Sequence, residues 1–223
     1  MPIDKIQLRR LLHLFYADPR SRRSFLLTDI RRTRAKSSGR QSKPGGDFHT
    51  GIWADMKAHA IGRADIRTSV AGRVAANKSR KRLYPLLGDA FLSIWNEKMR
   101  WRNEPFDYLP FGINGKIVFD ELDAVVKVEN AAGVVTWDGS HRVIYPYFFE
   151  EPALSPEAAR LGLWAMQQAL PSYAAESMRI VDVLRRSYLG VADAPLEGAE
   201  RDIFVAKYSS VIAEWEKLKA EKG

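Results

Sequence analysis

The 223-residue chain is 46% hydrophobic and 11% aromatic, which suffices for a domain with a sizeable core and excludes wholesale disorder. It has no cysteine, so disulfides and cysteine-ligated zinc are excluded and a cytoplasmic location is expected; no apolar run approaches the roughly 20 residues that span a bilayer. The formal charge of +8 is uneven, because residues 1–102 carry 23 Lys and Arg against 8 Asp and Glu, whereas residues 103–223 carry 12 against 19. The first half is therefore expected to attract a polyanion or an acidic protein.

Residues 1–46 are predicted to form a basic helical arm that ends in a flexible loop. Residues 4–17 place apolar side chains at helical spacing, and residues 21–35 are compatible with a second helix that has apolar residues on one side and arginines on the other. The stretch KSSGRQSKPGG (36–46) consists of Ser, Gly, Pro, Gln and basic residues without an apolar anchor. That composition is typical of a loop.

Residues 47–103 are predicted to be helical; the pattern changes at Glu104-Pro105, and residues 107–149 are predicted to form a meander of antiparallel strands. Pro85 is tolerated if it lies in the first turn of the last of these helices. The following stretch is rich in Val, Ile, Tyr and Phe and is punctuated by turn pairs, of which Asp138-Gly139 indicates a hairpin. Pro146 weakens the last strand, or places it at an edge or a bulge.

Two helices and a strand complete the chain. Ser155 is suited to cap a helix, and Pro156 to occupy its first position, so a helix is predicted over residues 155–170. Residues 178–190 alternate as in a strand, and residues 198–223 have an apolar face at helical spacing.

The predicted fold is α+β. A basic helical N-terminal region, residues 1–46, precedes a single domain, residues 47–223. In that domain a helical part (47–103) is followed by a core (104–223), which is a small, mostly antiparallel or mixed sheet flanked by helices.

Three segments in the second half stand in the order strand, helix, strand: KIVFDELDAVV, EAARLGLWAMQQAL and RIVDVLRRSYL. Over about residues 80–220 the chain resembles the restriction-endonuclease-like core of the PD-(D/E)xK superfamily, and its RecB-type exonuclease branch in particular. The first segment resembles the strand with the metal-binding Asp, and the second resembles the helix after the catalytic strand. The resemblance implies a site in which carboxylates from two strands hold divalent metal, and a Lys helps to activate water.

The chain departs from that family's pattern at the catalytic strand. Asp120 or Asp123 matches the first carboxylate, and Glu97 matches a carboxylate on the preceding helix. No Asp/Glu-x-Lys triplet occurs between residues 115 and 151, and the aligned strand has Tyr145-Pro146-Tyr147 instead. The core is therefore predicted to be degenerate and inactive. Mg or Mn is expected only if Glu97, Asp120 and Asp123 form an active site.

A run of basic residues is the strongest functional signal in the sequence. RRSFLLTDIRRTRAKSSGRQSK, residues 22–43, has a single acidic residue. Helical arginines followed by a basic loop suit phosphate contacts, because a guanidinium binds phosphate oxygens bidentately. A solvated helix face, or a face for an acidic protein, would explain the same run. The predicted nucleic-acid contacts are Arg22, Arg23, Arg31, Arg32, Arg34, Arg40 and Lys43, with Arg80 and Arg82 assisting.

The sequence thus predicts a nucleic-acid-binding protein with a degenerate nuclease-like core, without cofactor and without membrane contact. Its place as a subunit of a DNA-processing or phage-defence complex follows from the resemblance alone. Two alternatives stay open. One is an active, divergent metal-dependent nuclease, and the other is a protein-interaction adaptor whose basic face meets an acidic partner.

Overall fold

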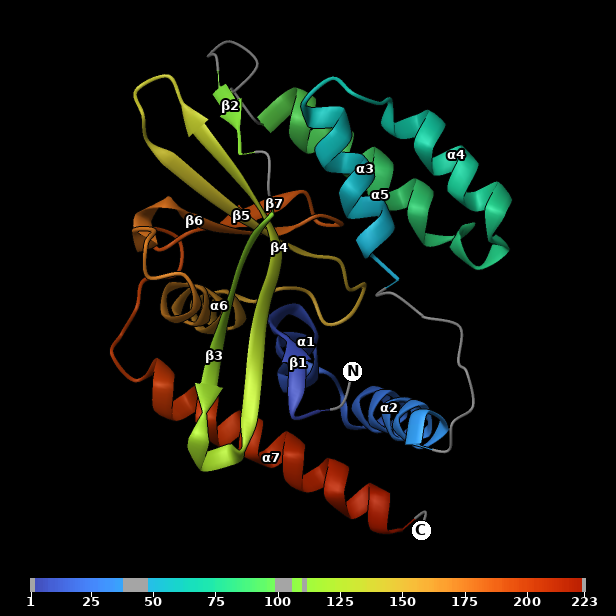
Figure 1. Cartoon of the computed structure of the whole chain (residues 1–223), viewed down its shortest axis with the longest axis vertical. Coiled ribbons are helices and arrows are strands. Elements are labelled where there is room, and N and C mark those ends of the chain that lie inside the picture. Colours follow the sequence, from blue (N-terminus) through green and yellow to red (C-terminus); the bar gives the residue numbers. More distant parts are fainter. Residues whose placement is uncertain (1–2, 38–47, 99–105, 110–111, 222–223) are drawn as a thin grey trace.

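The computed structural model describes residues 3–37, 48–98, 106–109 and 112–221. In this part of the chain a mixed sheet carries helices on both faces, so the predicted α+β fold is confirmed (Figure 1). The strands are β1 (Lys5–Gln7), β2 (Phe106–Tyr108), β3 (Ile113–Phe119), β4 (Ala124–Thr136), β5 (His141–Tyr147), β6 (Met178–Asp182) and β7 (Ser187–Leu189). The α-helices are α1 (Leu8–Tyr16), α2 (Pro19–Ser37), α3 (Thr50–Ala60), α4 (Ile66–Ala76), α5 (Leu83–Ser93), α6 (Pro156–Ala169) and α7 (Glu200–Ala220). No helix within the described ranges has the length and apolar character needed to cross a membrane.

Strand β4 is the centre of the sheet, because four strands pair along its two edges. On one edge β3 and β2 run antiparallel to it; on the other edge β1 runs parallel to residues 125–127, and β5 runs antiparallel to residues 132–135. Beyond β5 the sheet continues through β6, parallel to β5, and β7, antiparallel to β6. The pairing confirms the prediction of a mixed, mostly antiparallel sheet.

Alternating side chains of the strands divide the core into two clusters, as the period of two requires. In β5, Val143, Tyr145 and Tyr147 point into the main cluster with α1, α6 and α7. Ile144 and the following Phe148 point into a second cluster with α3, α4 and α5. Figure 1 shows these three helices together on one side of the sheet.

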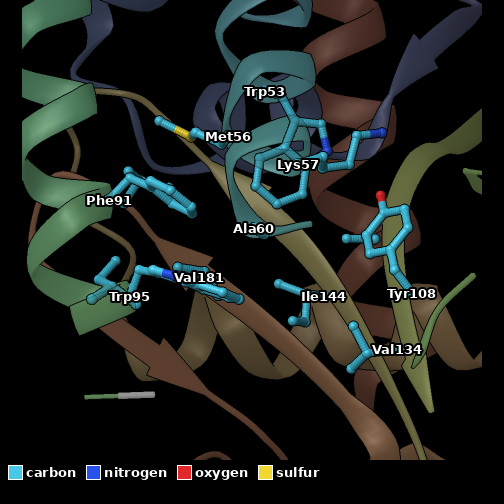
Figure 2. Close-up of a pocket in the computed structure, with 13 residues that line it drawn as sticks. Trp53, Met56, Lys57, Ala60, Phe91, Trp95, Tyr108, Val134, Ile144 and Val181 are labelled. Carbon is cyan, nitrogen blue, oxygen red and sulfur yellow. The ribbon is translucent and has the colours of Figure 1, made fainter. Parts of the chain in front are cut away.

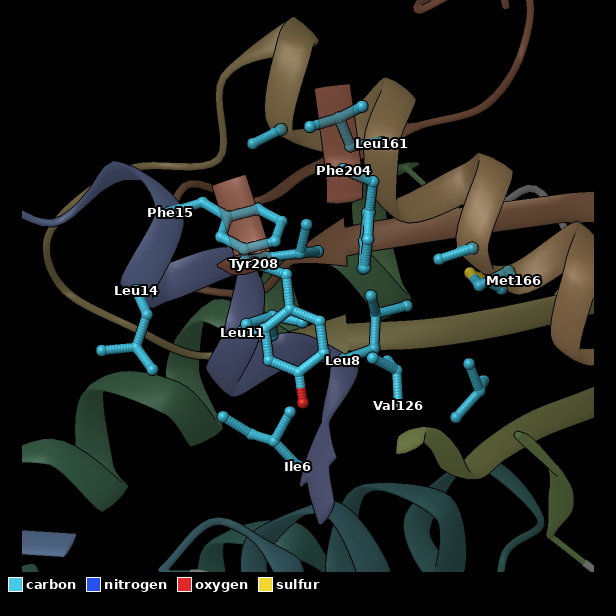
Figure 3. Packing of buried hydrophobic residues seen from close by; sticks show 14 of the residues in the cluster. Ile6, Leu8, Leu11, Leu14, Phe15, Val126, Leu161, Met166, Phe204 and Tyr208 are labelled. Atoms are coloured by element: carbon cyan, nitrogen blue, oxygen red, sulfur yellow. The ribbon is translucent and has the colours of Figure 1, made fainter. Parts of the chain in front are cut away.

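The N-terminal segment, which the sequence analysis treats as a basic helical region packed on the sheet, contributes to the main cluster. Figure 3 shows Ile6, Leu8 and Leu11 packed among side chains of β4, α6 and α7. The Tyr208 hydroxyl of α7 donates a buried hydrogen bond of 2.6 Å to the carbonyl of Ile3. A boundary at residue 46 therefore does not separate two hydrophobic cores.

Two predicted elements differ from the observed ones. Residues 5–7, predicted as the start of a helix, form β1, because pairing with β4 outweighs local helix propensity there. Residues 178–190, predicted as one strand, form the hairpin β6–β7, and the turn between the strands has Arg186 at a φ of 55°. Of the helices predicted over 47–103, those in the described residues 48–98 are confirmed as α3, α4 and α5, and Pro85 lies in the first turn of α5.

Local signals in the second half are confirmed. Ser155 caps α6 by accepting a hydrogen bond from the Ala158 backbone, with Pro156 at the first position. Asp138 and Gly139 form the β4–β5 turn, where Gly139 has a φ of 78°. Pro146 lies beyond the part of β5 that pairs with β4, so its missing N–H removes no bond to that strand.

Gly115 of β3 lies so close to α6 that a larger residue cannot fit. A Cβ atom there would collide with the backbone carbonyl of Ala169 and would come within 2.8 Å of the Leu170 side chain. We therefore expect Gly115→Ala to lower the free energy of unfolding by about 1–3 kcal/mol, as for other overpacked sites. Urea unfolding followed by circular dichroism measures this. Gly72→Ala is the control, because Gly72 on α4 has no atom within 4 Å of the added methyl and should gain up to about 1 kcal/mol. Equal stabilities of the two variants would contradict the packing of α6 on β3.

His13 of α1 is buried and gives the fold a dependence on pH. Its ring stacks on Phe149 with 4.1 Å between centroids, and burial, assisted by the charge of Arg10, lowers its pKa from 6.5 to about 4. The unfolded chain therefore binds more protons than the folded chain between these values, so stability falls as the pH falls. We expect a loss of about 2 kcal/mol between about pH 7.5 and about pH 5 that is absent in His13→Phe. His141→Phe, at an exposed position, should keep the wild-type profile. An unchanged profile in His13→Phe would show that other groups cause the dependence.

Candidate nucleic-acid interface

Helix α2, which carries most of the predicted phosphate contacts, is fixed at its start by Asp18. The carboxylate of Asp18 accepts hydrogen bonds of 3.0 Å from the backbone N–H groups of Arg20 and Ser21. Hydrogen bonds from Ser21, through its side chain and its backbone, are the main cause of the lowered pKa of Asp18. Pro19 then takes the first helical position, where its missing N–H costs nothing.

The inner side of α2 packs against the rest of the fold. Leu26 and Ile30 enter the main cluster, and α2 lies beside the C-terminal part of α7 (Figure 1). Asp29, the single acidic residue of α2, is buried on the same side, 3.6 Å from a guanidinium nitrogen of Arg10. Burial raises the pKa of Asp29, and the charge of Arg10 opposes this shift.

Three of the six arginines of α2 bind α7. Arg22 pairs with Glu214 at 2.7 Å, and Arg23 pairs with Glu221 at 3.1 Å. Arg34 donates a hydrogen bond of 2.9 Å to the carbonyl of Lys219, near the end of α7, where carbonyl groups lack helical partners. These arginines hold two helices together. Their part in binding nucleic acid stays a prediction.

The other three arginines of α2 face solvent. Arg31 and Arg32 are exposed and form no ion pair or side-chain hydrogen bond with any residue of the described part. Arg20 is also exposed and lies two residues after Asp18. It precedes Arg31 by eleven residues, about three helical turns or roughly 16 Å along the same side of the helix. The sequence analysis missed Arg20 because it expected this helix to begin at residue 21. The preceding Asp18-Pro19 pair is the signal that places Arg20 inside the helix.

Two other predicted contacts, Arg80 and Arg82, are not found on the exposed side of α2. Arg82 forms a two-pronged ion pair with Glu150, which raises the pKa of Arg82. Arg80 is half-buried, with its guanidinium 5.3 Å from the centre of the Tyr84 ring. Both lie at the start of α5, among the helices that cover the opposite face of the sheet. Arg40 and Lys43 lie outside the described residues.

Asp120 and Asp123 lie far along the sheet from the backbone of Glu97. Asp120 and Asp123 are exposed in the turn between β3 and β4, where Asp123 has a φ of 44°. Glu97 belongs by its backbone to the helical turn Ile94–Lys98 after α5, and Ile94 packs in the second cluster with Ala132. Ala132 is nine residues beyond Asp123, roughly 30 Å along an extended strand. No group of three or more His, Asp or Glu side chains in the described ranges is placed to hold a metal ion.

The Tyr145-Pro146-Tyr147 segment, where the sequence departs from the nuclease pattern, contributes its two tyrosines to packing. Tyr145 and Tyr147 are 0% and 2% exposed. The Tyr145 hydroxyl accepts a hydrogen bond of 3.3 Å from the backbone N–H of Arg9, in the first turn of α1. The Tyr147 hydroxyl donates one of 2.8 Å to the carbonyl of Pro152. These tyrosines fix α1 and the loop after β5 to the sheet.

The chain was compared with protein-family models, characterised proteins and solved structures, and none of them matched it. The resemblance to PD-(D/E)xK nucleases therefore rests on the order of the elements and on the quoted segments.

Proposed function

We propose that the chain binds nucleic acid through the outer side of α2, with Arg20, Arg31 and Arg32 contacting phosphates. The observation that carries the proposal is the division among the arginines of α2. Arg22, Arg23 and Arg34 are paired or hydrogen-bonded to α7, whereas Arg20, Arg31 and Arg32 are exposed and form no ion pair or side-chain hydrogen bond within the described ranges. Guanidinium groups that lie on one side of a helix without an ion pair attract a polyanion, and its binding releases the counterions condensed on that polyanion.

The chemistry of the same side favours nucleic acid over an acidic protein. Between the arginines, α2 exposes Ser24 and Thr28. Its large apolar residues are buried (Leu26 and Ile30) or partly buried against the main cluster (Phe25 and Leu27). Protein interfaces usually have an apolar centre, whereas nucleic-acid interfaces are polar and positively charged. Arg, Ser and Thr are common phosphate contacts, so we propose binding that is largely independent of base sequence.

The proposal includes binding without cleavage. Its support is the burial of Tyr145 and Tyr147 in the main cluster, together with the distance between the exposed Asp120–Asp123 turn and the part of β4 that pairs with β5. A place in a DNA-processing or phage-defence complex stays a suggestion of the resemblance.

The test is binding to labelled 20-nucleotide single strands and duplexes of DNA and RNA, measured by fluorescence anisotropy over a salt series. We expect log K to fall steeply with log salt. Replacing Arg20, Arg31 and Arg32 together by Ala should weaken binding and flatten the slope by about 2–3, since each phosphate contact contributes about 0.7–0.9.

The matched control replaces Arg63, Arg67 and Lys81 by Ala. These residues are exposed, Arg67 on α4 and the other two in the connections before α4 and before α5, so the net charge changes equally while α2 is untouched. An equal loss of affinity in both triple variants would show that binding depends on the overall charge of the chain and not on the outer side of α2. No binding at about 50 mM salt would overturn nucleic-acid binding by the isolated chain. Cleavage of the same strands with Mg or Mn, lost in Asp120→Ala or Asp123→Ala, would overturn binding without cleavage.

A further inference from the structure

The face of the sheet opposite to the main cluster is covered by helices over only part of its length. Asn130 has a φ of 64° and belongs to a bulge, where β4 has one residue more than β3. Beyond this bulge α3 and α5 pack on the sheet, and Figure 2 shows the aromatic pocket between Trp53, Phe91 and Ile144. The Trp53 indole donates a 2.7 Å hydrogen bond to the Asn130 carbonyl, and the Asn130 N–H is held by Asn114. The helical cover of this face therefore ends at the bulge.

Before the bulge, the same face of β1, β4 and β3 is largely open within the described part of the chain. Lys5 of β1 and Lys116 of β3 are exposed, and the Val118 side chain of β3 is 54% exposed. The side chains of this surface form two rows across the three strands. The register aligns Gln7, Lys127 and Lys116 in one row, and Lys5, Val125 and Val118 in the other.

Lys116 is the uncompensated charge of this surface. It lies directly opposite Lys127 of β4, and like charges in such positions repel each other. The Lys127 ammonium pairs with Glu129 at 3.2 Å, and Glu129 also accepts a hydrogen bond of 3.1 Å from Gln7. Lys116 forms no ion pair or side-chain hydrogen bond with any residue of the described ranges. A carboxylate beside β3 would therefore be attracted to Lys116.

The backbone of β3 has a free edge beside Lys116. Strand β3 pairs with β4 on one side only, and Figure 1 shows it at the border of the sheet. Within the described part of the chain, no other backbone hydrogen bond reaches residues 116–119. In an antiparallel pair, alternate residues direct their N–H and C=O groups outward, so this edge can accept a further strand.

We propose that the free edge of β3 binds an extended acidic segment of another protein as an added strand. The backbone of the segment would pair with residues 116–119. On the open face it would place an acidic side chain beside Lys116 and, two residues away, an apolar side chain beside Val118. In such complexes main-chain pairing gives affinity and the alternate side chains give specificity. This surface is separate from α2 and does not depend on nucleic-acid binding.

Two other occupants fit this surface less well. A second copy of β3 has one lysine and no acidic residue, so pairing of two β3 strands would bring like charges together. Nucleic acid would lack a stacking partner, because neither row of side chains contains an aromatic residue.

The experiment measures binding of short fluorescein-labelled peptides to the full chain by anisotropy at about 100 mM salt. The acidic peptide has the core Glu-Thr-Val-Thr-Glu, whose pattern is the same in both directions and suits parallel and antiparallel pairing. A neutral peptide has Gln in place of both Glu. A blocked peptide keeps the acidic side chains but has every core amide N-methylated, so its core cannot donate backbone hydrogen bonds. We expect the acidic peptide to bind at least about tenfold more tightly than either control.

Two variants of the chain locate the surface. Lys116→Gln should lower the affinity for the acidic peptide to that for the neutral peptide, whereas Lys78→Gln, at an exposed lysine before α5, should bind like the wild type. Val118→Thr keeps the branching of the side chain and should weaken the acidic and neutral peptides alike. Hydrogen–deuterium exchange in β3 should slow with the acidic peptide and stay unchanged with the blocked one.

Four results would overturn the proposal. One is the absence of saturation by the acidic peptide up to about 1 mM, an affinity too weak for a specific site. Another is equal binding of the acidic and blocked peptides, which would show attraction by charge without strand addition. Slower exchange in β3 when the chain alone is concentrated would assign the edge to a second copy. Displacement of the peptide by single-stranded DNA, with weaker DNA binding by Lys116→Gln, would assign the surface to nucleic acid.

The two binding surfaces can be tested apart. We expect Lys116→Gln to bind DNA and RNA like the wild type, and the triple variant of Arg20, Arg31 and Arg32 to bind the acidic peptide like the wild type. A failure of the β3 surface and a failure of the α2 interface are therefore distinguishable.

Discussion

Backbone pairing along β4 is the constraint on which the rest of the structure depends. Its two edges hold β1 and β5 end to end on one side, and β3 and β2 on the other. Every paired backbone group in this strand is thereby satisfied inside the protein, where an unpaired one would be costly. Because β1 leads directly into α1, the same pairing also places the N-terminal helices. Helix α2 and its exposed arginines reach their position on α7 through this strand.

The bulge at Asn130 divides β4 into two parts whose side chains alternate between the two faces of the sheet in different registers. Before it, Val126 and Val128 point into the main cluster; after it, Ala131 does so, and Ala132 points into the second cluster. One extra residue therefore shifts the alternation by one position, which a regular strand cannot do. The helices α3 and α5 can then pack on the far part of β4, and Trp53 and Lys57 are held at the junction. The aromatic pocket is a consequence of this local irregularity.

What the sequence predicts well is what short-range chemistry determines. The cap and proline of α6, the Asp138-Gly139 turn and the apolar face of α7 each act within a few residues, and each is confirmed. Strand β1 depends on pairing with β4, more than a hundred residues away in the chain. The bulge at Asn130 depends on Asn114, about fifteen residues away. The arginines of α2 show the same limit. Their number is visible in the sequence, but the pairing of Arg22 and Arg23 with Glu214 and Glu221 requires the position of α7.

The N-terminal segment also explains why a nuclease-like order of elements need not carry nuclease chemistry. A catalytic strand must present its polar side chains to substrate and metal, whereas β5 presents Tyr145 to the first turn of α1. A carboxylate at that position would be buried in the main cluster, and burial of a charge without a partner is expensive. The tyrosine satisfies an orphan N–H of the helix and fills the space with an aromatic ring. The N-terminal segment that packs against Tyr145 also leads into α2, whose Arg20, Arg31 and Arg32 are exposed. One packing arrangement therefore both buries this side of β5 and places the arginines at the surface.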